Sequence, residues 1–112
     1  MPIKLAIANN NPNTYMPLVQ LGIAQAKLFD LPVSTLSYDI DYYPPLVTAV
    51  SSYNGLLVIA AGNAGINNNS NSLHTDLKNL GNVIFVANST ASDNISAGSN
   101  YGTSNVDLAA PV

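Results

Sequence analysis

The stretch LLVIAAGNAGINNNSNS, residues 56–72, passes from an uninterrupted apolar run into glycine, asparagine and serine. A short run that is apolar on both faces is typical of a central strand in a parallel sheet, covered on each side by helices. The polar part begins with the amide side chain of Asn63, between the small residues Gly62 and Ala64. Ligands of open α/β sheets bind beyond the carboxyl ends of the strands, so we expect Asn63 to lie where chemistry would take place.

Strands and helices alternate around this run. Residues 14–29 carry apolar side chains at spacings of three and four, which predicts a helix with Asn13 or Thr14 as its N-cap. The other expected elements are a helix at 45–53 and strands at 3–8, 31–37, 56–61, 82–88 and 105–110. A loop is expected between the strands at 56–61 and 82–88. The alternation predicts an α/β fold with a mostly parallel sheet and right-handed crossovers. A length of 112 residues predicts one domain.

The composition excludes several classes of partner. Charged residues make up 8% of the chain, the net charge is −3, and the only cations are Lys4, Lys27 and Lys78. No basic stripe is available to neutralise phosphates, so we expect no nucleic-acid partner. No apolar run approaches the roughly 20 residues that cross a bilayer, so we expect no membrane partner and no signal peptide in this chain. The chain has no cysteine, which excludes disulfides and thiolate metal sites.

Four stretches carry a family resemblance. They are MPIKLA at 1–6, GLLVIAAGNAGINNN at 55–69, GNVIFVANSTASDN at 81–94 and SNYGTSNVDLAAP at 99–111. In order and approximate spacing, they resemble the catalytic domain of subtilisin-like serine peptidases, the subtilases. The resemblance implies a three-layer, subtilisin-like α/β fold, of which residues 1–112 form a partial domain between the family's His and Ser motifs. It also implies a serine endopeptidase with a polypeptide substrate and an extracellular location.

The same resemblance implies a role for particular residues. Asn63 is similar to the side-chain donor of the oxyanion hole, which stabilises the tetrahedral intermediate of peptide hydrolysis. Ala61 and Gly62 resemble one wall of the pocket for the residue before the scissile bond. The strand end formed by Leu36, Ser37 and Tyr38, with Asp39 after it, resembles the segment that pairs with an extended substrate. The family usually has glycines where this chain has Asp39 and Ile40.

The three motifs of the catalytic triad do not occur in this sequence. The Asp motif D-[ST]-G, the His motif H-G-T-H and the Ser motif G-T-S-M-A are all absent. Ser104 lies in a GTS tripeptide, but in a stretch that precedes the family's nucleophile, and His74 is expected to be a solvated loop histidine. We therefore expect the 112 residues alone to be inactive, as the middle of a catalytic domain whose flanking parts are missing partners.

Several interpretations stay open. The stretch NAGINNNSNS, residues 63–72, could supply oxygen ligands to calcium or form a plain flexible loop; we expect no cofactor. Asp39 and Asp41 could act in acid–base chemistry, although a solvated turn explains them better. Besides the peptidase, two other functions fit the pattern. One is a non-catalytic peptide-binding module or degenerate peptidase remnant, and the other is a flavodoxin-like domain that holds an anion at GNAG.

Overall fold

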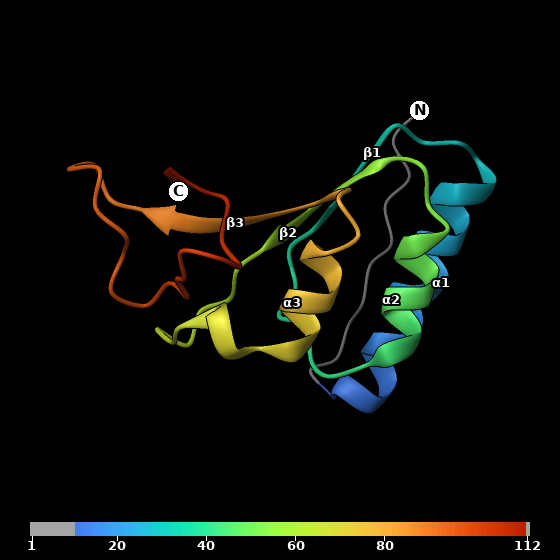
Figure 1. The fold of residues 1–112 in the computed structure, drawn as a ribbon, viewed down its shortest axis with the longest axis horizontal. Helices are drawn as coiled ribbons and strands as arrows, with labels where there is room; N and C mark the ends of the chain where they lie inside the picture. Colours follow the sequence, from blue (N-terminus) through green and yellow to red (C-terminus); the bar gives the residue numbers. More distant parts are fainter. Residues whose placement is uncertain (1–10, 112) are drawn as a thin grey trace.

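The computed structural model describes residues 11–111, which form a parallel sheet with helices (Figure 1). In chain order, the elements are α1 (Pro12–Leu28), β1 (Val33–Leu36), α2 (Pro44–Ser51), β2 (Leu56–Ala60), the 3₁₀ helix η1 (Asn68–Ser70), α3 (Ser72–Lys78), β3 (Val83–Ser89) and β4 (Leu108–Pro111). The predicted α/β class is confirmed. The strand expected at 3–8 lies outside the described residues.

The four strands follow one another across the sheet in sequence order, β1-β2-β3-β4, and every neighbouring pair is parallel. The register pairs Leu36 with Ile59, Ala60 with Val86, and Ser89 with Pro111. Because all the strands run in the same direction, their carboxyl ends and the turns that follow them gather at one edge of the sheet. That edge includes the turns after Leu36 and Ala60.

Helix α1 begins earlier than the sequence predicted. Its N-cap is Asn11, whose side-chain oxygen accepts a hydrogen bond from the Asn13 backbone N–H at 3.0 Å. Proline at the first helical position costs no hydrogen bond there, because the first N–H groups of a helix have no partner within the helix. The prediction that Asn13 or Thr14 caps the helix is therefore wrong, since both lie inside it.

The described helices pack on one face of the sheet. Leu57 and Ile59 of β2 and Phe85 of β3 are buried, and they belong to one core with apolar side chains of α1, α2 and α3. The alternate residues, such as Val58 and Ile84, are only half-buried. In Figure 1 the helices lie together on one side of the strands, with α1 beside α2. Within residues 11–111, the α-helical layer on the opposite face is absent.

Two helical segments occupy the region expected to be a loop. Asn71 caps α3 by accepting a hydrogen bond from the His74 backbone N–H at 3.1 Å, and Leu73 and Leu77, one turn apart, are buried in the core. The apolar pattern covers little more than one helical turn, and it follows a run of asparagine and serine that favours caps and turns. The part of the chain that the structure describes has no helix both long and apolar enough to cross a membrane.

Candidate active site

The side chain of Asn63 lies just beyond the carboxyl end of β2. β2 ends at Ala60, and the turn that follows contains two glycines with positive φ, Gly62 at 111° and Gly65 at 66°. Asn63 is exposed, and no group within residues 11–111 forms a hydrogen bond with its side-chain amide. The amide can therefore donate to a ligand without losing a partner in the chain.

Asn100 holds the turn on both sides of Asn63. Its side-chain oxygen accepts hydrogen bonds from the backbone N–H groups of Ala64 at 2.9 Å and Ile66 at 3.2 Å. Its side-chain NH₂ donates to the carbonyl oxygen of Ala61 at 3.1 Å, and its backbone N–H donates to the carbonyl oxygen of Gly62 at 2.9 Å. Asn100 is only 7% exposed, so these bonds are shielded from water and fix the turn.

The close approach of Asn100 explains why residue 62 is a glycine. A Cβ atom at Gly62 would lie 2.4 Å from the Nδ2 atom of Asn100 and 2.8 Å from the Oδ1 atom of Asp39. The φ angle of 111° is also one that residues with a side chain rarely adopt. Gly62 is therefore required by both the backbone and its neighbours, and it brings the turns after β1 and β2 into contact.

Further asparagines join the segment around Asn100 to the segment after β2. Asn68, which is fully buried, donates to the Ala61 carbonyl at 2.8 Å. Asn105 donates to the Asn68 carbonyl and to the Thr75 hydroxyl, both at 2.8 Å. The Asn69 oxygen accepts from the backbone N–H groups of Ser104 and Asn105. The interpretation of residues 63–72 as a plain flexible loop is therefore wrong, because amide side chains join this stretch to residues more than 30 positions away.

The asparagine oxygens in this stretch have other partners than a cation. Those of Asn67 and Asn71 cap η1 and α3, and that of Asn68 accepts a hydrogen bond from Asn100. Among residues 11–111, no group of three or more histidines or aspartates is arranged to hold a metal ion. Calcium binding stays a prediction from the sequence.

An open cavity of about 480 Å³ lies at the carboxyl edge of the sheet, and we call it the cleft. Its lining includes five of the six residues that the resemblance places at the substrate: Leu36, Ser37, Ala61, Gly62 and Asn63. The others in the lining are Thr35, Val58, Ile59, Ala60, Val86, Ala87, Asn88, Ser99, Ala110 and Pro111. Two stretches 25 residues apart in the sequence, at 36–37 and 61–63, thus face one hollow.

Tyr38 is the predicted site residue that does not line the cleft. Its ring packs against that of Tyr15, with centroids 5.3 Å apart, and it lies against the core of the domain. Asn88 is a lining residue that the sequence did not indicate, and its Oδ1 atom is buried without a hydrogen-bond partner among the described residues. No sequence motif marks this residue, since it lies near the end of an ordinary apolar strand, β3.

Tyr15 anchors the turn after β1. Its hydroxyl donates to the carbonyl oxygen of Asp39 and to the Oδ2 atom of Asp41, each at 3.0 Å. Burial, together with the hydrogen bond and the charge of Asp41, raises the pKa of Tyr15 to about 12. The hydroxyl therefore keeps its proton at neutral pH and remains a donor. Both aspartates are exposed, as expected of a turn, but Asp41 is bound by Tyr15.

His74 is not the solvated loop histidine that the sequence suggested. It lies in α3, is 3% exposed, and stacks on Phe85 with ring centroids 4.3 Å apart and planes 9° apart. Burial lowers its pKa to about 4, although the negative charge of Asp39 acts in the opposite direction. His74 is therefore neutral at pH 7, and its ring belongs to the core.

Ser104 has no imidazole beside it in residues 11–111. The only histidine of the chain, His74, is buried against Phe85. The Ser104 backbone N–H donates to Asn69, which holds the residue in the turn after Gly102. The geometry supplies no base for a Ser104 nucleophile.

The turn after β2 also offers no cradle for an anion. The backbone N–H groups of Ala64 and Ile66 bind Asn100, and that of Gly65 donates to the Gly98 carbonyl at 3.1 Å. Helix α3 begins only at Ser72, well after the GNAG stretch. Two of the N–H groups of GNAG that could bind a phosphate, those of Ala64 and Gly65, are thus already used within the fold, and no helix N-terminus follows directly.

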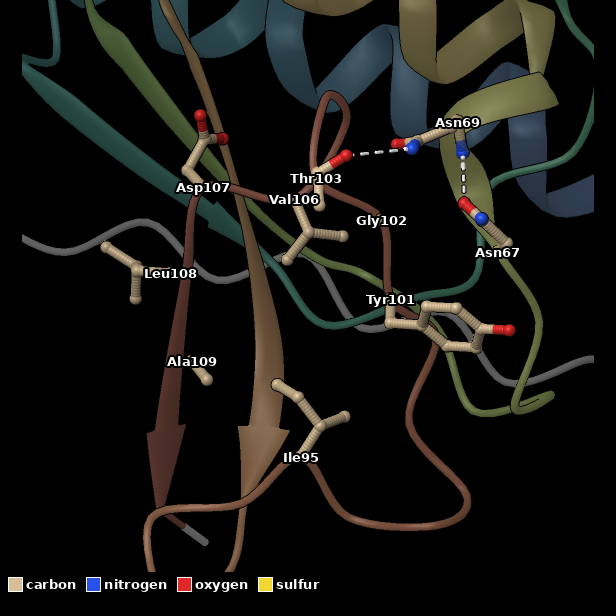
Figure 2. Close-up of a pocket in the computed structure, with 10 residues that line it drawn as sticks. All are labelled: Asn67, Asn69, Ile95, Tyr101, Gly102, Thr103, Val106, Asp107, Leu108 and Ala109. Carbon is tan, nitrogen blue, oxygen red and sulfur yellow. Dashed lines mark hydrogen bonds between the residues drawn. The ribbon is translucent and has the colours of Figure 1, made fainter.

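A second cavity, of about 440 Å³, lies beside β4 (Figure 2). It is lined by Asn67, Asn69, Ile95, Tyr101, Gly102, Thr103, Val106, Asp107, Leu108 and Ala109. Figure 2 shows Asn69 joined to Thr103 across one end of it, a hydrogen bond of 3.2 Å. Its one carboxylate, on Asp107, pairs with Lys78 and accepts from the Phe85 backbone N–H. It therefore presents apolar surface and no available reactive group.

Comparisons with known proteins show the family and the fold. The family model of the S8 peptidases, described as the subtilase family, matches residues 3–112. A solved structure of the epidermin leader peptide processing serine protease (EpiP) from Staphylococcus aureus is 25% identical, with a TM-score of 0.64 over 83% of this chain. A lanthipeptide protease of 22% identity and TM-score 0.59, also over 83% of this chain, shares the fold. The chain spans 30% and 32% of those two proteins. A search of the curated proteins found no match.

Proposed function

The chain belongs to the subtilase family, and we propose that it is part of a serine endopeptidase that cleaves peptide bonds by acyl transfer. In this proposal the 112 residues supply the oxyanion donor and the substrate-binding strand, while the Asp, His and Ser of the triad come from outside them. The observation that carries the proposal is the exposed amide of Asn63 at the cleft, on a turn held by Asn100.

The role of Asn63 follows from the chemistry of acyl transfer. When a nucleophile attacks a peptide carbonyl, the carbonyl oxygen gains negative charge, and donors already in place stabilise it without reorganisation. Asn63 has an amide that makes no hydrogen bond within residues 11–111, while the backbone N–H groups of Ala64 and Ile66 beside it are bound by Asn100. The turn is thus fixed, while the donor itself is free to meet the oxyanion.

The substrate runs along the end of β1 in this proposal. Leu36 and Ser37 line the cleft opposite Ala61 and Gly62, so an extended peptide between them meets backbone groups on one side and small residues on the other. The side chain before the scissile bond then enters the space beside Gly62, and the scissile carbonyl reaches Asn63. Tyr38 supports this wall through its contact with Tyr15.

The test begins with the coding DNA on both sides of this reading frame. An H-G-T-H stretch upstream and a G-T-S-M-A stretch downstream, in the same frame, are the expected result. In that polypeptide, Asn63→Ala should lower kcat by about 10²–10³ with little change in KM, which is the magnitude for loss of one oxyanion donor in a subtilisin, the reference case for this effect. Asn94→Ala, at an exposed asparagine of the loop before Ser99, is the matched control and should leave kcat unchanged.

The chain of 112 residues alone should neither hydrolyse peptides nor react with a fluorophosphonate. If it did either, the assignment of the nucleophile to another segment would be wrong, and Ser104 would have to be replaced next.

A second candidate function is a peptide-binding module without catalysis. The observation that favours it is an intact cleft in a sequence that has none of the three triad motifs. Stop codons or unrelated sequence on both sides of the reading frame, combined with peptide binding by the chain, would support this function and contradict the peptidase.

A further inference from the structure

Asn54 and Gly55 form the only asparagine–glycine pair in the sequence. They lie in the turn between α2, which ends at Ser51, and β2, which begins at Leu56. Asparagine is a thermolabile residue, and a glycine after it has no side chain to hinder attack of the glycine nitrogen on the asparagine amide. The fold decides whether this attack takes place, since both groups must be free to meet.

Both reacting groups are free of hydrogen bonds within residues 11–111. Asn54 is exposed, and its side-chain amide has no hydrogen-bond partner in that part of the chain. The peptide group between the two residues forms none there either, neither through the N–H of Gly55 nor through the C=O of Asn54. The nitrogen can therefore lose its proton to water and approach the side chain without breaking a bond of the fold.

The four asparagines in residues 11–111 that precede alanine or serine are restrained instead. The side-chain oxygens of Asn69 and Asn71 accept hydrogen bonds from backbone N–H groups, and the Oδ1 atom of Asn88 is buried. Asn63 is exposed, but the N–H group of Ala64 after it is bound by another side chain. Asn54 thus differs from them in both the residue that follows it and the freedom of its amide.

Packing requires the glycine of this pair. A Cβ atom at Gly55 would lie 2.2 Å from the hydroxyl oxygen of Tyr53 and 2.5 Å from the carbonyl oxygen of Leu31. On either side of the unbonded peptide group, the Nδ2 atom of Asn82 donates to the carbonyl oxygens of Tyr53 at 3.0 Å and Gly55 at 3.1 Å. The fold therefore keeps a glycine, and with it the labile pair, at the start of β2.

We propose that Asn54 is a site of spontaneous deamidation in the folded protein. The nitrogen of Gly55 attacks the Cγ atom of Asn54, the side-chain NH₂ leaves with the N–H proton as ammonia, and a cyclic succinimide forms. Water then opens one of the two carbonyls of this ring. Opening at Cγ gives aspartate, whereas opening at the main-chain carbonyl gives isoaspartate, in which the backbone runs through the former side chain.

The two products should affect the fold differently. Aspartate adds a negative charge at an exposed position and keeps the path of the backbone. Isoaspartate adds a methylene group to the backbone between Tyr53 and Gly55, whose carbonyl oxygens both bind Asn82. Either these bonds or the register that pairs Leu57 with Val83 must then shift. Isoaspartate should therefore destabilise the chain, and aspartate should not.

The test compares the 112-residue chain incubated in buffer and in guanidinium chloride, at one alkaline pH and one temperature. Peptide mapping by mass spectrometry follows the replacement of NH₂ by OH at each asparagine and separates isoaspartate from aspartate. In buffer, Asn54 should react before any other asparagine of residues 11–111, at nearly the rate that it has in denaturant. Asn69 and Asn71 should react several-fold more slowly in buffer than in denaturant, because the fold binds their side-chain oxygens.

Two variants assign the product to one residue. Asn54→Gln keeps the amide on a longer side chain, which would have to close a larger ring, and should abolish the early product. Asn94→Gln is the matched control at an exposed asparagine followed by isoleucine, and should leave the product unchanged. After incubation in buffer, the parent chain should unfold at a lower denaturant concentration in proportion to its isoaspartate content, while Asn54→Gln and fresh Asn54→Asp keep the midpoint of the fresh parent chain.

The other outcomes would overturn the inference, and none of them bears on the proposed function. If the fold slowed Asn54 as much as Asn69 and Asn71, the turn before β2 would not be free. Equal rates in buffer and in denaturant at all three residues would remove the contrast that the fold supplies. An earlier reaction at another described asparagine would assign the labile site elsewhere. A midpoint unchanged by isoaspartate would contradict the role given to Asn82.

Discussion

The turn after β2 and the turn after β1 form the two sides of the cleft, and different chemistry holds each of them. Neutral amides fix the β2 side, where Asn100 and Asn68 bind backbone groups on either side of Asn63. On the β1 side, the Tyr15 hydroxyl does so by donating to the backbone carbonyl oxygen of Asp39 and to the carboxylate of Asp41. Amides do not titrate, so the hydrogen bonds on the side that would bind the oxyanion do not themselves depend on protonation.

The largest effect should come from removing the amide that fixes the β2 side. Asn100→Ala removes the acceptor of the Ala64 and Ile66 backbone N–H groups and the buried bond to the Ala61 carbonyl oxygen, and should lower the free energy of unfolding by about 3–4 kcal/mol. Urea denaturation measures this difference. Asn94→Ala is the control, because the Asn94 side chain is exposed and donates only to a carbonyl two residues away. Equal losses in the two variants would contradict the role given to Asn100.

Acid should destabilise the domain through His74, a residue of α3. The folded-state pKa is lowered to about 4 from 6.5 in the unfolded chain, so between these values only the unfolded state binds the proton. Stability from this residue is therefore complete above pH 6.5 and lost as the pH falls toward 4, by about 2–3 kcal/mol in total. Denaturation from pH 7 to 4 tests this, and His74→Leu should flatten the profile in that range. If the stability of His74→Leu depended on pH as that of the parent chain does, His74 would not be the cause of the acid destabilisation.

The contact between the two sides can be broken at Gly62. Gly62→Ala adds a Cβ atom into Asn100 and Asp39 at a φ of 111°, and should cost about 2 kcal/mol of stability through strain and displacement of these side chains. Gly98→Ala is the matched control, because a Cβ atom there meets nothing within 4 Å. Urea denaturation measures the free energy of unfolding of both variants. Equal values for Gly62→Ala and Gly98→Ala would contradict the close approach at Gly62.

A smaller loss is expected when the β1 side is released. Tyr15→Phe removes the hydroxyl bonds to Asp39 and Asp41 and should cost about 1 kcal/mol. Tyr42→Phe, at a residue 74% exposed, provides the control and should be neutral. Equal stabilities of Tyr15→Phe and the parent chain in urea denaturation would indicate that the Tyr15 hydroxyl does not hold this turn.

Local patterns were sufficient where neighbouring residues decide the structure. The apolar runs around Leu57 and Phe85 predicted β2 and β3 to within a residue or two, because a strand buried in a parallel sheet requires such a run. The change from apolar to polar residues after Ala61 placed Asn63 at the carboxyl edge for the same reason. The start of α1 and the short helix α3 were missed, since one capping asparagine among many decides each of them.

The sequence by itself determined the fold class, the order of the strands along the chain and the family, because each depends on residues close together or on motifs in a fixed order. Only the tertiary structure decided which asparagines hold Asn63, that His74 is a core residue, and that Asp39 lies against Gly62. Those contacts join residues that are 11 to 39 positions apart, from His74 and Phe85 to Ala61 and Asn100. A hydrogen bond or a buried ring depends on where the packed elements bring these residues, which no local pattern encodes.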